Sequence, residues 1–303
     1  MPIFFIISGF FLGQHINEDG WYGRAVKKRI RTLVIPFFAL NLFWWPVKYG
    51  MHYVGVRYFG MNGTNPNEDI TLYNFFYYTG LLPWGGDCVV GLWYVRALFY
   101  LVISSPILVW LITKGKVVAL SLLFALLILW CVQMEMMPIA GKFLESKMRA
   151  EYCLRCPLYF GIGLLISQIK PIAFPKWASV AVIPVAILLL YCQKMCQFNM
   201  VSAKVVIGFF ATIAIALALW TIIPSEKWPK VLTSNSFTVF VLHGMILYLF
   251  PIVFKALKIW DATLNAIGGV VYWVAVIALS IVIAEVIKRR FPKIACIAFG
   301  GRC

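Results

Sequence analysis

The stretch VVIGFFATIAIALALWTII, residues 205–223, decides the fold class of this chain. It carries no charged side chain and is long enough, as a helix, to cross a hydrocarbon layer about 30 Å thick. Its apolar residues are continuous, without the in/out alternation that the strands of a membrane β-barrel need. The stretch therefore predicts a transmembrane α-helix.

Similar apolar runs recur along the whole chain, and no connector between them is long enough for a separate soluble domain. About nine runs can cross the bilayer, the shorter ones with help from neighbouring helices or interfacial aromatic residues. We therefore expect an all-α fold, a polytopic transmembrane helix bundle that forms one integral membrane domain over residues 1–303. The runs are 2–13, 33–47, 89–112, 117–137, 157–169, 177–192, 205–223, 236–254 and 268–287.

The composition excludes an ordinary soluble enzyme. Hydrophobic residues make up 62% of the chain and charged residues 13%, whereas soluble domains are about 45–50% apolar. One soluble core of this size cannot bury so much apolar surface. The 27 Lys and Arg residues outnumber the 11 Asp and Glu residues, but they form small groups between apolar runs, so we expect no nucleic-acid partner.

The basic groups also predict the orientation in the membrane. If the connector 14–31 lies in the cytoplasm, most of the 27 Lys and Arg residues fall on the cytoplasmic side, with a strong group near each end of the chain. Short cytoplasmic loops carry such an excess of positive charge. We therefore expect a cytoplasmic C-terminus.

The eight cysteines include two close pairs, Cys153 with Cys156 and Cys192 with Cys196, both near predicted outer ends of spans. No paired histidines accompany them, so we expect no metal site. Disulfides on the outer side and ordinary apolar packing both remain open interpretations.

Soluble catalytic motifs such as a phosphate-binding Gly-rich loop or a metalloprotease helix are absent from the sequence. Chemistry is therefore expected from ionisable groups within the bundle, because these are costly to bury in a membrane. His243, followed by Gly244, is a candidate for proton transfer, and a hydrogen-bonded packing histidine is the alternative. Arg96 either faces an internal cavity or extends to the interface.

The basic stretch KKRIRTLVIP, residues 27–36, leads into a predicted span. On an α-helix Lys28, Arg31 and Thr32 share one side, because residues three and four apart are neighbours. Such a group suits phosphates, either of lipid headgroups or of a nucleotide-bearing donor such as coenzyme A. A membrane anchor without a ligand explains the stretch equally well, and the second basic stretch, 288–293, allows the same two interpretations.

Five strings in this order resemble the acyltransferase-3 family of integral membrane O-acyltransferases, the bacterial enzymes that acetylate or otherwise acylate exported sugars. Each string is weak alone, but their order across nearly the whole chain is fairly specific. They are PIFFIISGFF (2–11), the basic stretch 28–31 leading to Ile35 and Pro36, LWYVRAL (92–98), SFTVFVLH (236–243), and the tail 290–302. Phe240 stands where the family usually has Tyr, which removes a hydroxyl that would help to fix the tautomer of His243.

The resemblance implies a function at the bacterial inner membrane. An acyl group, most often acetyl, would pass from cytoplasmic acyl-CoA to a hydroxyl of a glycan or lipid-linked saccharide. Lys28, Arg29 and Arg31 would hold the phosphates of the donor, Arg96 would orient the acceptor or the acyl carbonyl, and His243 would assist proton transfer. Membrane lipid, acyl-CoA and the saccharide are the expected partners, with no permanently bound cofactor.

Two other interpretations of the sequence stay open. The resemblance implies an additional first span that bears an Arg and the usual catalytic His, and neither has a counterpart in this chain. We therefore expect either a start site upstream of Met1 or a truncated, inactive relative. A saccharide or lipid transporter or flippase is the alternative function, although the sequence shows no matching halves of the kind found in transporters.

Overall fold

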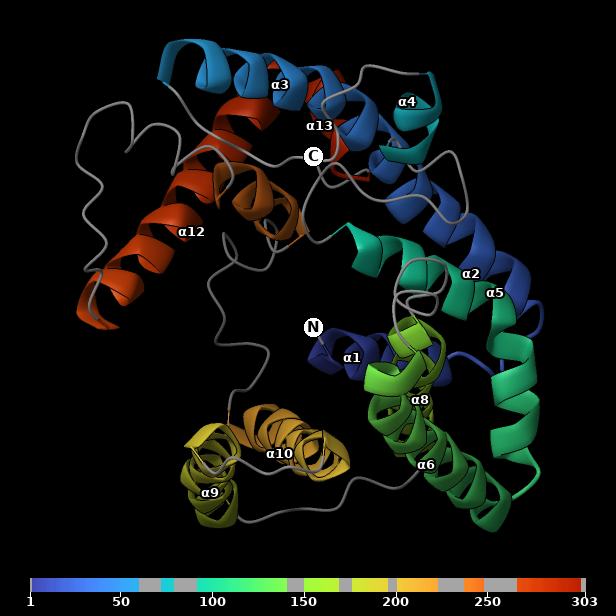
Figure 1. The fold of residues 1–303 in the computed structure, drawn as a ribbon. Helices are drawn as coiled ribbons and strands as arrows, with labels where there is room; N and C mark the ends of the chain where they lie inside the picture. Colours follow the sequence, from blue (N-terminus) through green and yellow to red (C-terminus); the bar gives the residue numbers. More distant parts are fainter. Residues whose placement is uncertain are drawn as a thin grey trace. The chain divides into compact units, whose positions relative to one another are not determined.

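The structure is a computed structural model, shown in Figure 1. It describes residues 2–59, 72–78, 92–140, 150–168, 176–195, 201–222, 237–247 and 266–300. Regular structure in these ranges is helical throughout, which confirms the all-α fold class. Each apolar run predicted from the sequence overlaps a helix.

The chain divides into two compact units. Unit 1 comprises Met1–Lys27 and Ala97–Trp228, and unit 2 comprises Lys28–Arg96 and Pro229–Cys303. Both units are therefore built from segments that are far apart in the sequence. The prediction of one membrane domain over the whole chain stays a prediction.

Unit 1 contains α1 and a group of long apolar helices. In this unit α8 packs against α1 and α6, and α10 packs against α9, α6 and α1. Figure 1 shows α9 and α10 side by side. The helices are α1 (Pro2–Gly13), α6 (Lys116–Ala140), α8 (Ala150–Ser167), α9 (Lys176–Met195) and α10 (Val201–Ile222), with most of α5 (Trp93–Thr113).

Two glycines allow α1 and α8 to pack backbone against backbone. A Cβ atom added to Gly9 would clash with the carbonyl oxygen of Phe160, and one added to Gly163 would clash with that of Ile6. Lipid is as apolar as the helix faces, so the hydrophobic effect does not drive membrane helices together. They associate through close van der Waals packing, which small residues allow. The contact therefore depends on the absence of side chains at both positions.

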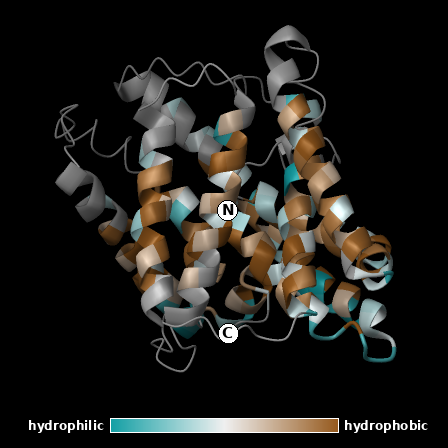
Figure 2. Cartoon of the chain, turned by 90° about the horizontal axis from the view of Figure 1, so that it is seen from below, coloured by the Kyte–Doolittle hydropathy of each residue, from teal (hydrophilic) through white to brown (hydrophobic). Residues whose placement is uncertain are grey.

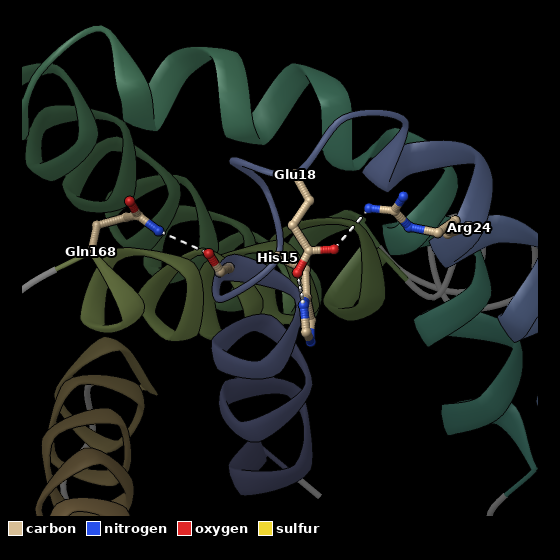
Figure 3. Close-up of polar contacts among 5 residues, drawn as sticks. His15, Glu18, Arg24 and Gln168 are labelled. Atoms are coloured by element: carbon tan, nitrogen blue, oxygen red, sulfur yellow. Dashed lines mark hydrogen bonds and ion pairs between the residues drawn. The ribbon is translucent and has the colours of Figure 1, made fainter.

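The segment 14–31, predicted to be a connector, contains the helix α2 (Trp21–Arg29). Its Lys, Arg and Ala residues favour helix, and the following span continues the helical backbone. Ahead of α2, the Glu18 carboxylate accepts hydrogen bonds from His15 Nδ1 at 2.6 Å and from Arg24 Nη2 at 2.7 Å (Figure 3). The hydrogen bond from His15 and the neighbouring charges hold the pKa of Glu18 below its ordinary value.

Unit 2 contains a π-helical turn, η1 (Ile30–Val34), followed by α3 (Ile35–Phe59) and α4 (Leu72–Tyr78). The helix Phe237–Leu247, α12 (Ala266–Arg290) and α13 (Pro292–Ala298) complete the described part of this unit. The short helix α13 packs against both α12 and α3, and α4 contacts α3 (Figure 1). The C-terminal helices therefore lie beside the span that follows the basic stretch.

Two helical stretches, Trp21–Val47 and Trp93–Thr113, are long and apolar enough to cross a membrane by length and composition. Other described helices carry shorter apolar segments, so the number of spans stays a prediction. Figure 2 shows hydrophobic residues along most of the helices, with hydrophilic residues gathered mainly near helix ends. Large apolar side chains such as Phe124 and Leu188 are exposed, as expected for helices that contact lipid.

Candidate functional site

All five residues that the sequence singles out, Lys28, Arg29, Arg31, Arg96 and His243, belong to unit 2. The three basic residues lie where α2 ends and η1 begins. Lys28 and Arg31 are exposed, whereas Arg29 is half-buried. The basic stretch therefore presents two cations to the surroundings and turns a third toward the protein.

The π-helical turn changes the expected geometry of the basic stretch. Its hydrogen bonds join residues five apart, so the rule that residues three and four apart share a face does not hold unchanged across it. The Thr32 hydroxyl donates its proton to the Lys28 carbonyl oxygen at 2.9 Å. Thr32 can thus only accept a hydrogen bond from a ligand, which makes Lys28 and Arg31 the better phosphate contacts.

The C-terminal segment packs onto this turn. Gly300 has a φ of 66°, and a Cβ added there would lie 2.5 Å from the Thr32 carbonyl oxygen. Ala295 and Phe299 are buried on the same segment. The helix α13, which joins the basic residues 288–293 to Gly300, has seven residues and is therefore only about 10 Å long. The basic groups at the two ends of the sequence therefore come to the same part of unit 2, with Lys293 exposed on α13.

A row of side chains connects the basic stretch to the candidate histidine. The Arg29 guanidinium lies within range of a charge interaction with the Tyr94 hydroxyl, without a hydrogen bond between them among the described contacts. The Tyr94 and Phe240 rings meet edge to face with centroids 5.5 Å apart, and the Phe240 and His243 rings are 5.7 Å apart. We call Arg29, Tyr94, Phe240 and His243 the Arg–His row. It brings together three of the strings on which the family resemblance rests.

The backbone determines which nitrogen of His243 is basic. Nδ1 lies 3.1 Å from the carbonyl oxygen of Val239, one helical turn earlier. A carbonyl oxygen only accepts, so Nδ1 is the donor, and in the neutral ring the lone pair is on Nε2. The tautomer is thus set without a tyrosine at position 240, which answers the concern that Phe240 raised.

Arg96 lies in the first turn of α5, where its backbone N–H donates to the Leu92 carbonyl oxygen at 3.2 Å. It is half-buried, between the fully buried Val95 and the half-buried Ala97. Arg96 is two positions after Tyr94 on the helix, so their side chains leave the helix in different directions. Arg96 is therefore close in sequence to the Arg–His row without standing in line with it.

Two polar residues at this site were missed by reasoning from the sequence. Tyr94 was read only as part of a string, although its position two residues before Arg96 was a usable signal. Thr238 is fully buried, and its hydroxyl has no hydrogen-bond partner among the residues that the structure describes. A single threonine in an apolar helix gives no sequence signal, because many such hydroxyls bond to their own backbone.

The cysteine and metal questions have simpler outcomes. Cys156 is buried and carries a thiol rather than a disulfide, so Cys153 and Cys156 are not bonded to each other. Cys192 belongs to α9, and Cys196 lies outside the described residues. Within the described ranges, no group of three His, Cys, Asp or Glu side chains is placed to hold a metal ion.

A helical bundle that places a histidine next to aromatic rings, in the same unit as several cations, has the parts of a group-transfer site in a membrane protein. Comparison with known families agrees with this class. The model of the acyltransferase-3 family, described as an acyltransferase domain, matches residues 1–289. The chain belongs to this family of membrane acyltransferases. No curated protein and no solved structure matches it.

Proposed function

We propose that the protein transfers an acyl group, most simply acetyl, from acyl-CoA to a hydroxyl of a glycan or lipid-linked saccharide. The observation that carries this proposal is the Arg–His row, which ends in a histidine whose basic nitrogen is set by the backbone. Family membership supplies the acyltransferase class, and the residues of the row supply the chemistry.

His243 acts as the general base in this proposal. Its Nε2 takes the proton of the acceptor hydroxyl, the oxygen attacks the thioester carbonyl, and the C–S bond breaks to release the CoA thiolate. The imidazolium then returns the proton to the thiolate, so the products are an ester and free CoA. A sugar hydroxyl is a poor nucleophile at neutral pH until its proton is withdrawn. Arg96 orients the acceptor or the acyl carbonyl.

Lys28 and Arg31 hold the phosphates of the donor, because they are the exposed cations of the basic stretch. Arg29 links donor binding to the Arg–His row, since it follows Lys28 directly and lies within range of a charge interaction with Tyr94. Donor binding at this end thus continues into the row that reaches His243. The exposed Lys293 on α13 adds positive charge close to the same turn.

We place the protein in the bacterial inner membrane, with lipid as a partner. On α13 and just before it, Phe291, Ile294 and Ile297 are 57%, 59% and 54% exposed at helical spacing, next to the exposed cations of 289–293. This combination suits the surface of an anionic bilayer. The distribution of basic residues favours a cytoplasmic C-terminus, whereas the disulfide at Cys296 favours an oxidising compartment. Labelling of engineered cysteines at 28–31 from each side of the membrane decides between them.

Membranes that contain the protein and are incubated with radiolabelled acetyl-CoA test the reaction. We expect label to appear covalently in glycan or lipid-linked saccharide. Uptake of a saccharide without covalent transfer would instead identify a transporter. No transfer and no uptake would identify an inactive relative.

Donor binding has its own test. Arg31→Ala is expected to raise the KM for acetyl-CoA about tenfold, the loss of one charge-assisted contact to a phosphate. Lys114→Ala is the matched control, because Lys114 is an exposed cation of unit 1 that lies over Trp110. Equal KM values for wild type and Arg31→Ala would remove Arg31 from the donor site.

A further inference from the structure

A second polar cluster lies in unit 1, whereas Lys28, Arg29, Arg31, Arg96 and His243 belong to unit 2. On α6 the side chain of Trp130 is only 6% exposed, and its indole Nε1 has no hydrogen-bond partner among the described residues. The amide oxygen and nitrogen of Gln133 are both buried and lack partners within the same ranges. Residues three apart on an α-helix share a face, so these unpaired groups lie together.

The neighbouring helices add further polar groups beside this face. The Arg155 guanidinium of α8 lies 5.6 Å from the centre of the Trp130 ring. The Tyr159 ring is 6.2 Å from the same ring, and its hydroxyl forms a hydrogen bond with Thr212 of α10. Arg155 and Gln133 are half-buried, so the cluster reaches the surface of the unit.

Unpaired groups of this kind are costly in a bundle that lies in lipid. No bulk water is available in the hydrocarbon region to satisfy an amide or an indole N–H. A cation inside or beside such a bundle marks a functional site by default. Tyr159 bonds to Thr212, whose hydroxyl donates to the Gly208 carbonyl oxygen at 2.7 Å, whereas Trp130 and Gln133 are left with two kinds of donor and one acceptor.

The unpaired groups select one class of ligand. An amide presents a donor and an acceptor side by side, which matches neighbouring hydroxyls that each donate and accept. An anionic ligand would meet the Gln133 oxygen unfavourably, and a purely apolar ligand would leave every group unpaired. The aromatic rings of Trp130 and Tyr159 supply the apolar surface that the C–H face of a sugar ring requires.

We propose that Trp130, Gln133 and Arg155 bind the hydroxyl groups of a saccharide. The choice of a saccharide rests in part on the function proposed above. Gln133 lies near the C-terminal end of α6 and Arg155 near the N-terminal end of α8.

Binding is tested on the full chain in nanodiscs by native mass spectrometry, with octyl-β-glucoside as the probe and no acyl-CoA present. Octyl tetraethylene glycol, which has the same alkyl chain without a sugar, is the matched ligand. We expect retention of the glucoside in preference to the glycol. Gln133→Leu should lower glucoside affinity about tenfold, the effect of losing one hydrogen bond to the ligand.

The same variant should not lower the Tm, because leucine replaces a buried amide that lacks partners with an apolar group of similar size. The matched control is Gln168→Leu, since the Gln168 amide nitrogen donates to the Gly13 carbonyl oxygen at 2.9 Å (Figure 3). This control should lower the Tm and leave glucoside retention unchanged.

Equal retention of both detergents, or unchanged glucoside binding by Gln133→Leu, would overturn the proposal. A Gln133→Leu variant with both a lower Tm and weaker glucoside binding would also overturn it, because Gln133 would then have a packing role or hold a structural water. Failure of the proposed function is a separate result. A protein that retains the glucoside but transfers no label refutes only the acyl transfer. One that transfers label without preferring the glucoside refutes only this site.

Discussion

The α1–α8 contact of unit 1 and the Arg–His row of unit 2 use the same apolar composition in opposite ways. In the first, Gly9 and Gly163 bring two backbones together without side chains between them. In the second, aromatic rings 5.5 and 5.7 Å apart separate a cation from a histidine. The comparison shows that glycines let two backbones meet directly, whereas aromatic rings fill the space beside the histidine with side chains.

The largest expected effect concerns the end of the row. His243→Ala should lower acyl transfer by about 10²–10⁴-fold, since the acceptor hydroxyl loses its base. His15→Ala is the matched control, because His15 is an exposed histidine of unit 1 that bonds to Glu18. Initial rates with radiolabelled acetyl-CoA measure both variants. Full activity of His243→Ala would show that the Arg–His row only packs the helices, as the α1–α8 contact does.

The glycine contact predicts a stability effect instead. Gly163→Ala should destabilise unit 1 by about 3 kcal/mol, because the new methyl group meets the backbone of Ile6, which cannot move aside as a flexible side chain can. Gly23→Ala is the control, since nothing lies within 4 Å of a Cβ at that position. Thermal unfolding in detergent is the measurement. A Tm equal to that of wild type would show that α1 and α8 are not packed backbone to backbone.

Gly300 of unit 2 also makes a close backbone contact, in this case with Thr32 in the turn that carries the basic stretch. Gly300→Val should cost about 1–3 kcal/mol through its positive φ and its approach to Thr32. It should also raise the KM for acetyl-CoA, since displacement of the turn moves Lys28 and Arg31. Parallel Tm and KM measurements check this. Lower stability with an unchanged KM would separate the C-terminal segment from donor binding.

The smallest effect belongs to Glu18, which is fully exposed. Its folded-state pKa is lowered, first by the hydrogen bond from His15, so its stabilising contribution is complete above the ordinary value of 4.5 and is lost as the pH falls through the lowered pKa. Wild type should be slightly more stable than Glu18→Gln at neutral pH, and the two should converge in acid. Tm values over this pH range provide the test, and a difference that grows on acidification would contradict it.

The sequence singled out candidate site residues but not their grouping. The structure places Lys28, Arg29, Arg31, Arg96 and His243 in one unit, and their catalytic and binding roles stay predictions. The π-helical turn could not be predicted, because an insertion of one residue into a helical ladder leaves no mark in the pattern of apolar residues. Trp130 and Gln133 could not be singled out from the sequence, because such residues are common in membrane spans. They are unusual only because their polar atoms are buried and lack hydrogen-bond partners among the described residues.

The sequence by itself determined that this chain is an all-α membrane protein of the acyltransferase-3 family, because apolar runs without alternation can satisfy their backbone groups in lipid only as helices. Only the tertiary structure decided that the Tyr94 ring meets the Phe240 ring, that Val239 sets the tautomer of His243, and that Gly300 rests on Thr32. These contacts join residues that are distant in the chain or depend on where a side chain turns. Both properties follow from packing rather than from the local pattern of residue types.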